Sequence, residues 1–145
     1  MNAFAGSELQ GLLPPQSHEA EQSVIGGLIL DGAKLPELKL VADDFYSRPH
    51  RLIFTAMQRL HSRRENIDLV TLMTEMESAG EIGDAGGVGY LVECGKVTPS
   101  AANIKAYAKI VKDNSIRRTA IAKYNSAIEA MMSTEFTSTE ERFEQ

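Results

Sequence analysis

Residues 98–132, TPSAANIKAYAKIVKDNSIRRTAIAKYNSAIEAMM, decide the fold, because they predict one helix far longer than any other in the chain. The stretch contains no glycine, and its one proline, Pro99, suits the first helical position, where the backbone N–H has no intrahelical partner. Thr98 is the expected N-cap. At about 1.5 Å per residue, such a helix spans on the order of 50 Å, which exceeds the width of a small domain. We therefore expect it to project and bind a partner; the alternative is a long core helix within one bundle.

The composition is that of an ordinary globular protein, with 43% hydrophobic and 24% charged residues in a chain of 145. Its longest apolar run, residues 24–30, contains two glycines and is far shorter than the roughly 20 residues that cross a bilayer. No signal peptide is evident, so we expect a cytoplasmic protein without membrane contact. Cys94 is the only cysteine and is expected to pack in the core, while the net charge of −5 gives no overall attraction to nucleic acid.

The chain before the long helix predicts a flexible arm, residues 1–16, and a globular helical head, residues 17–97. Gly6, Gly11 and two prolines prevent regular structure in the arm. In the head, Ser17 is expected to cap a helix that ends at Asp31. The Gly26-Gly27 pair inside this helix indicates that another backbone approaches closely.

Two further helices are expected at residues 48–62 and at residues 69–79, the second capped by Asp68. Residues 33–41, interrupted by Pro36, predict at most a short turn of helix, and a glycine-rich loop leads to a short helix from residue 90 that Gly95 closes. No long alternation of apolar and polar residues occurs, so strands are not expected. The predicted fold class is all-α, with a compact helical head followed by a long helix.

The sequence after the long helix predicts the start of another one. Thr137 with Glu140, and Ser138 with Glu141, are two capping-box candidates. Residues 98–145 therefore read as a long helix plus the beginning of a second helix, which would fold back on the first as an αα-hairpin. Because a natural chain seldom stops so soon after a helix begins, we expect a fragment of a longer protein.

No catalytic constellation is apparent. The phosphate-binding pattern G-x-x-x-x-G-K-[ST] is absent, since Val97 follows Gly95-Lys96. The histidines lack metal-ligand spacing and are interpreted as surface or core residues: His18, His50 and His61. We therefore expect no catalytic, cofactor-binding or metal-binding residue, and interpret the chain as a binding and assembly module.

Three arginines cluster near the C-terminal end of the helix predicted at residues 48–62: Arg59, Arg63 and Arg64. Positive charge at this end complements the helix dipole. A solvated, dipole-matched helix end is the favoured interpretation, and a phosphate-binding role is the alternative.

Several short strings, in this order and spacing over residues 13–132, resemble the N-terminal domain of DnaB-type replicative DNA helicases, bacterial or phage-encoded. Residues 14–28, PPQSHEAEQSVIGGL, are similar to a P-x-x-x-E-A-E-x-x-x-L-G-G core in that family. Pro36 departs from the family, because it stands where a short helix is expected. The other strings are DFY at 44–46, PH at 49–50, IF at 53–54, IDLVTL at 67–72, GG at 86–87, YL at 90–91, TPSAANI at 98–104 and YAKIV at 107–111.

The resemblance implies a helical head followed by a helical hairpin. In that family the hairpins pair as dimers, and three dimers form a collar on a hexameric ring. The collar contacts the C-terminal helical domain of primase, and loader proteins engage the hexamer. ATP-driven 5′ to 3′ unwinding of duplex DNA belongs to a RecA-like C-terminal domain that this sequence lacks. ATP and Mg²⁺ are therefore expected only for that missing domain, and DNA only through the full-length hexamer.

The first hypothesis is thus a scaffolding domain of a replicative helicase that oligomerises and recruits primase. The candidates for partner or dimer contacts are Ile104, Tyr107, Val111, Ile116, Ile121, Ile128 and Met131, and the alternative for each is packing against the second hairpin helix. A second hypothesis is a complete small protein that mimics a helicase collar and competes for its partners. A third is a fragment that itself hydrolyses nucleotide, which the missing phosphate loop disfavours.

Overall fold

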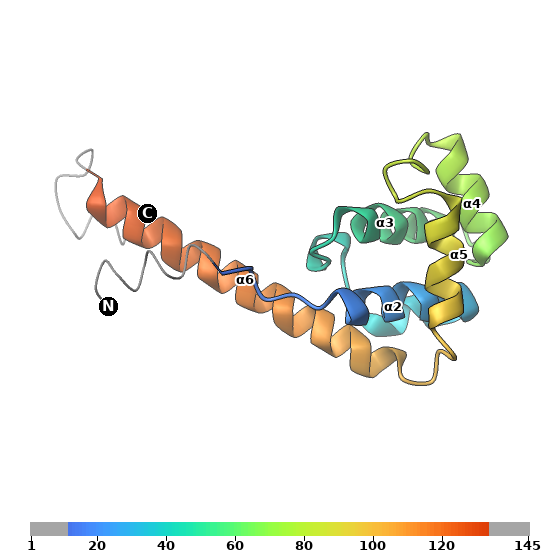
Figure 1. Ribbon diagram of the computed structural model, residues 1–145, viewed down its shortest axis with the longest axis horizontal. Coiled ribbons are helices and arrows are strands. Elements are labelled where there is room, and N and C mark those ends of the chain that lie inside the picture. The colour runs from blue at the N-terminus through green and yellow to red at the C-terminus, as the bar shows by residue number, and fades with distance from the viewer. Residues whose placement is uncertain (1–11, 134–145) are drawn as a thin grey trace. The chain divides into compact units, whose positions relative to one another are not determined.

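The computed structural model describes residues 12–133, and every regular element in that part of the chain is a helix (Figure 1). The all-α fold expected from the sequence is therefore confirmed. The elements are α2 (His18–Leu30), η1 (Gly32–Leu38), η2 (Ala42–Asp44), α3 (Arg48–Ser62), α4 (Leu69–Ser78), α5 (Val88–Val97) and α6 (Ile104–Met132), where η marks a 3₁₀-helix. The predicted start of a second hairpin helix lies outside the described residues, as does most of the predicted arm.

The chain divides into two compact units, and the boundary between them falls inside α6. The head unit is Gln16–Ser115. The second unit, which we call the α6 unit, contains the described residues 12–15 and 116–133.

The core of the head unit contains residues from all five α-helices. On α6 the buried residues Ile104, Ala108 and Val111 recur at helical spacing. Ser115 is the last buried residue of this helix in the described chain, and its hydroxyl donates a hydrogen bond of 2.8 Å to Asp44. The other principal core residues are Val24, Ile25, Leu28, Ile53, Phe54, Met57, Leu60, Leu72, Met76, Leu91 and Cys94.

The capping residues and helix bounds that the sequence predicts for the head unit agree with the structure. The Ser17 hydroxyl accepts a hydrogen bond of 3.1 Å from the Ala20 amide at the start of α2. Asp68 and Thr71 form a capping box at the start of α4, and α3 has the predicted bounds. Pro36, expected to interrupt its segment, lies inside the 3₁₀-helix η1.

The Gly26-Gly27 pair lies where neighbouring chain approaches α2 most closely. A Cβ atom on Gly26 would stand less than 3.0 Å from the Thr98 side chain and the Cys94 carbonyl oxygen, and one on Gly27 would meet the Ile104 side chain. The glycines therefore let α2 pack tightly against the end of α5 and the start of α6, as the sequence predicted.

The predicted start of the long helix is wrong. Thr98 has extended backbone angles, φ −102° and ψ 106°, which suit a residue that precedes proline. Its hydroxyl donates a hydrogen bond of 3.0 Å to the Cys94 carbonyl, so Thr98 closes α5 instead of opening α6. α5 itself begins at Val88 and runs through Gly95 to Val97, so it is longer than predicted at both ends.

Among the described helices, none combines the length and the apolar character that crossing a membrane requires.

Candidate functional site

A buried polar cluster joins α2, α3 and α5 inside the head unit. His50 Nδ1 lies 2.8 Å from Glu21 Oε1, and His50 Nε2 lies 2.5 Å from the Tyr90 hydroxyl. His50 is 0% exposed and Glu21 only 2%, so both side chains lie inside the head unit. The cluster therefore ties three helices together. Within the described chain, no group of three or more His, Cys, Asp or Glu side chains is placed to hold a metal ion.

Glu21 is held as a carboxylate at the centre of this cluster. Its oxygens also accept hydrogen bonds from the backbone amides of Tyr46, at 2.7 Å, and Ser47, at 3.2 Å. Burial alone would raise the pKa of Glu21, but the hydrogen bonds from His50 and from these amides outweigh it, and the pKa lies below its ordinary value. The carboxylate thus anchors the chain that enters α3.

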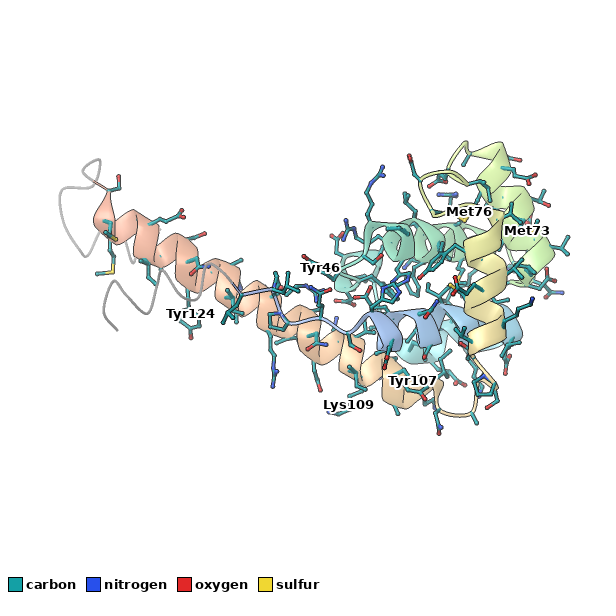
Figure 2. The ribbon with its side chains drawn as sticks, viewed as in Figure 1. Tyr46, Met73, Met76, Tyr107, Lys109 and Tyr124 are labelled. Atoms are coloured by element: carbon teal, nitrogen blue, oxygen red, sulfur yellow. The ribbon has the colours of Figure 1, made fainter. Side chains whose placement is uncertain are left out.

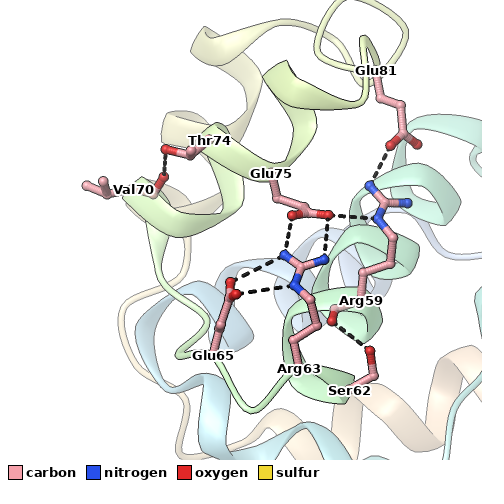
Figure 3. A network of polar contacts seen from close by, with 8 residues as sticks. All are labelled: Arg59, Ser62, Arg63, Glu65, Val70, Thr74, Glu75 and Glu81. Carbon is pink, nitrogen blue, oxygen red and sulfur yellow. Dashed lines mark hydrogen bonds and ion pairs between the residues drawn. The ribbon is translucent and has the colours of Figure 1, made fainter.

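Two of the three arginines near the end of α3, Arg59 and Arg63, are engaged by carboxylates (Figure 3). Arg59 Nε donates to Glu75 at 3.0 Å and its Nη2 to Glu81 at 2.5 Å. Arg63 donates to both oxygens of Glu75, at 3.1 and 2.5 Å, and also pairs with Glu65. These contacts fasten α3 to α4, and a phosphate ligand would have to compete with them.

Glu75 is expected to make the free energy of unfolding depend on pH in the acidic range. Hydrogen bonds from Arg63, and then from Arg59, lower the pKa of Glu75 from 4.5 to about 2. Its contribution is therefore fully present above about pH 4.5 and is lost as the pH falls toward 2, because the unfolded carboxyl binds a proton first. Urea unfolding of Glu75→Gln between pH 5 and pH 2 should show a weaker loss of stability with acid than the parent chain.

The control for this prediction is Glu77→Gln, on the same helix. Glu77 is exposed and forms no ion pair with another described residue. If both variants show the same acid dependence, Glu75 does not carry the effect.

The structure separates the predicted contact residues of α6 into two groups. Ile104 and Val111 are buried in the head core, and Tyr107 is partly buried against it. Their apolar surface is therefore covered largely by this chain itself. The remaining four are exposed in the α6 unit: Ile116, Ile121, Ile128 and Met131.

Three of these exposed residues share one face with a residue that the sequence analysis missed. Ile121, Tyr124, Ile128 and Met131 follow one another at spacings of three, four and three, which places them in one row along a helix. We call this row the α6 stripe. Tyr124 is 71% exposed and projects from the helix (Figure 2). The alternation of three and four was the signal that could have found it.

Ile116 is exposed but lies elsewhere on the helix surface. It precedes Ile121 by five residues, so it falls outside the three-four spacing of the stripe, and at about 100° per residue its side chain points about 140° away from that of Ile121. The α6 stripe therefore has a natural control within the same helix. A row with this spacing is the pattern by which one helix packs against another.

Comparison with known sequences identifies relatives of the chain. The model for the family "DnaB-like helicase N terminal domain" matches residues 13–113. The replicative DNA helicase DnaB of Pasteurella multocida is 41% identical over 127 residues, which are 86% of this chain and 27% of that protein. The DnaB helicase of Geobacillus stearothermophilus is 44% identical over 108 residues, 73% of this chain and 24% of that protein. The chain thus spans about a quarter of the length of these curated relatives.

Solved structures agree with the sequence relatives. The N-terminal domain of DnaB helicase from Mycobacterium tuberculosis has a TM-score of 0.85 and 30% identity, with 91% of this chain and 94% of that chain covered. The N-terminal domain of DnaB helicase from Helicobacter pylori, described with its interactions with primase, has a TM-score of 0.68 and 26% identity, with 92% of this chain and 100% of that chain covered. The head fold and the long helix are therefore features that this chain has in common with solved domains.

Proposed function

This chain belongs to the family of DnaB-like helicase N-terminal domains, and from that premise we propose that it is an assembly domain, which self-associates through α6 and recruits primase to a replicative helicase. The observation that carries the proposal is the α6 stripe. An exposed apolar row on a helix marks a surface that another protein covers. The spacing of the row favours a second helix as its occupant.

Recruitment of primase is proposed on the strength of the relatives. The Helicobacter pylori domain and a DnaB-like replicative helicase, 25% identical with a TM-score of 0.71, were both described together with their interactions with primase. By the same family reasoning, loader proteins and a hexameric assembly that engages DNA in the cytoplasm are further proposals for a replicative helicase that contains this domain. ATP and Mg²⁺ would be used by the remaining three quarters of such a helicase.

Self-association should depend on the α6 stripe. Ile121→Asp with Ile128→Asp is expected to weaken it at least tenfold, because each change places a charge in an apolar contact. The measurement is the dimer dissociation constant of the 145-residue chain by sedimentation velocity. Ile116→Asp, on another face of the helix, should leave that constant close to the parent value.

A chain that is monomeric up to millimolar concentration, or that associates equally in all three forms, would contradict the proposed role of the stripe. The primase part is tested separately by calorimetric titration with the C-terminal helical domain of the cognate primase, where saturable binding is expected. Absence of binding by a dimeric chain would reject primase as its partner while leaving self-association in place.

A further inference from the structure

A cavity of about 310 Å³ lies in the head unit, between α3 and the chain of η1 with the residues that follow it. This volume is at the lower end of the range for ligand pockets, so it suits one large side chain better than a whole cofactor. The apolar part of the lining belongs to the head core and comes from Leu35, Leu40 and Phe54. The cavity shares no residue with the buried polar cluster or with the α6 stripe.

Three polar side chains line the same cavity: Lys39, Gln58 and His61. Lys39 and His61 are exposed and Gln58 is partly exposed, so the polar part of the lining borders solvent. None of these three side chains forms a hydrogen bond or an ion pair with another described residue. By contrast, three lysines of α6 pair with carboxylates: Lys105, Lys109 and Lys112. The cavity therefore offers a ligand one unpaired cation and two further hydrogen-bonding groups.

The backbone at the edge of the cavity offers two more donors. Lys39 follows η1 in the left-handed conformation, with φ 54° and ψ 38°. A helical residue followed by a left-handed one turns successive amide N–H groups toward a common point, and such a nest binds anions. The amides of Lys39 and Leu40 donate to no described residue. An anion held by these amides would lie beside the cavity, because both residues line it.

We propose that this cavity binds the C-terminal end of a partner polypeptide whose last side chain is large and apolar. The side chain packs against the apolar lining, and Lys39 with the nest amides binds the terminal carboxylate, a recurring mode of peptide recognition.

A C-terminal residue suits the cavity because it carries both groups on one Cα atom. In an extended internal segment, an apolar side chain and that of a neighbouring aspartate or glutamate point to opposite sides. The choice of a polypeptide as the occupant rests on the proposed role of the chain as an assembly domain. It does not depend on the α6 stripe.

The test is an NMR titration of the ¹⁵N-labelled 145-residue chain with a short acetylated peptide that ends in phenylalanine with a free carboxylate. The amide signals of Lys39 and Leu40 should shift and saturate, with a dissociation constant of about 1 mM or tighter. The same peptide with an amidated C-terminus should bind at least tenfold more weakly, because it lacks the charge. A peptide that ends in serine should also bind at least tenfold more weakly, because the apolar lining stays uncovered.

Two variants of the chain test the two halves of the site. Lys39→Asn removes the ammonium group, and asparagine tolerates the left-handed conformation, so the melting temperature should hold while binding weakens at least threefold. Gln58→Phe places a larger apolar side chain at the cavity and should compete with the peptide for its space. The matched control is Arg64→Asn, which should leave binding unchanged. Arg64 is also basic, exposed and left-handed, with φ 59°, but it does not line the cavity.

Three results would overturn the inference. Equal binding of the free-acid and amidated peptides would show that the terminal carboxylate is not recognised. If N-acetylphenylalanine binds as tightly as the peptide, the cavity is a site for a small amphipathic acid instead of a polypeptide end. No saturable shift at Lys39 and Leu40 up to several millimolar peptide rejects the site altogether. Each of these results leaves the dimer dissociation constant, and with it the proposed self-association, unaffected.

Discussion

Glu21→Ala is expected to lower the free energy of unfolding by about 3–5 kcal/mol. The carboxylate accepts hydrogen bonds from His50 and from the amides of Tyr46 and Ser47. Alanine would leave the buried His50 ring without its acceptor and would remove the acceptor of the two partly buried amides, and an unsatisfied buried group costs about 1–3 kcal/mol. Urea unfolding at pH 7 followed by circular dichroism measures the change.

Two companion variants make this prediction specific. Glu19→Ala, an exposed position in the first turn of α2, should change stability by less than about 0.5 kcal/mol. Glu21→Gln keeps an acceptor but not the charge, so its loss should fall between the two. Because the pKa of Glu21 is lowered on folding, the parent chain should also lose stability as the pH falls below 4.5, and Glu21→Gln should not show this part of the loss. Equal stabilities for Glu19→Ala and Glu21→Ala would contradict the role given to the cluster.

Gly26→Ala should also destabilise the chain, by about 1–3 kcal/mol or more, because it overpacks the contact between α2 and α5. The new methyl group would stand less than 3.0 Å from the Thr98 side chain and from the Cys94 carbonyl oxygen, which is backbone and cannot turn aside. Either α2 must move away from α5, or the hydrogen bond from Thr98 to Cys94 must break.

Gly89→Ala is the matched control for this substitution. Gly89 is helical, in α5, and an added Cβ would have no neighbour within 4 Å. Alanine there should stabilise the chain by about 0.5–1 kcal/mol through its better helix propensity. Thermal unfolding of both variants should shift the midpoint in opposite directions. A Gly26→Ala chain as stable as the parent would show that α2 and α5 are less tightly packed than the structure indicates.

The features that were predictable from sequence depend on neighbours within a few residues. Ser17 and Asp68 cap their helices through the next turn of chain, so their identity and position suffice to find them. Gly26-Gly27 could be interpreted correctly because glycine inside a helix is costly unless something approaches it. The prediction for Thr98 was wrong because threonine suits either the end of one helix or the start of the next. Its hydrogen bond to the Cys94 carbonyl oxygen places it at the end of α5.

The features that were missed depend on distant parts of the chain. The buried polar cluster brings together residues from three helices: Glu21, His50 and Tyr90. No pattern of neighbouring residues in the sequence predicts these contacts. Only some of the predicted contact residues of α6 lie on the surface. The face with Ile104 and Val111 packs into the head unit, while the face with Tyr124 is exposed. The periodicity of apolar residues predicts the helix, but the packing of the head unit decides which face of the helix stays exposed.

Because Cys94 is buried, the rate at which its thiol is alkylated can report how often the helices of the head unit separate. This thiol, the only one in the chain, is 0% exposed beneath α2, and burial, as the largest influence, raises its pKa, so it stays protonated and unreactive while the helices are closed. An alkylating reagent can reach it only in molecules whose α2 and α5 have momentarily separated. The rate of that labelling, compared with the rate in the unfolded chain, therefore reports how often the domain opens, without any introduced probe.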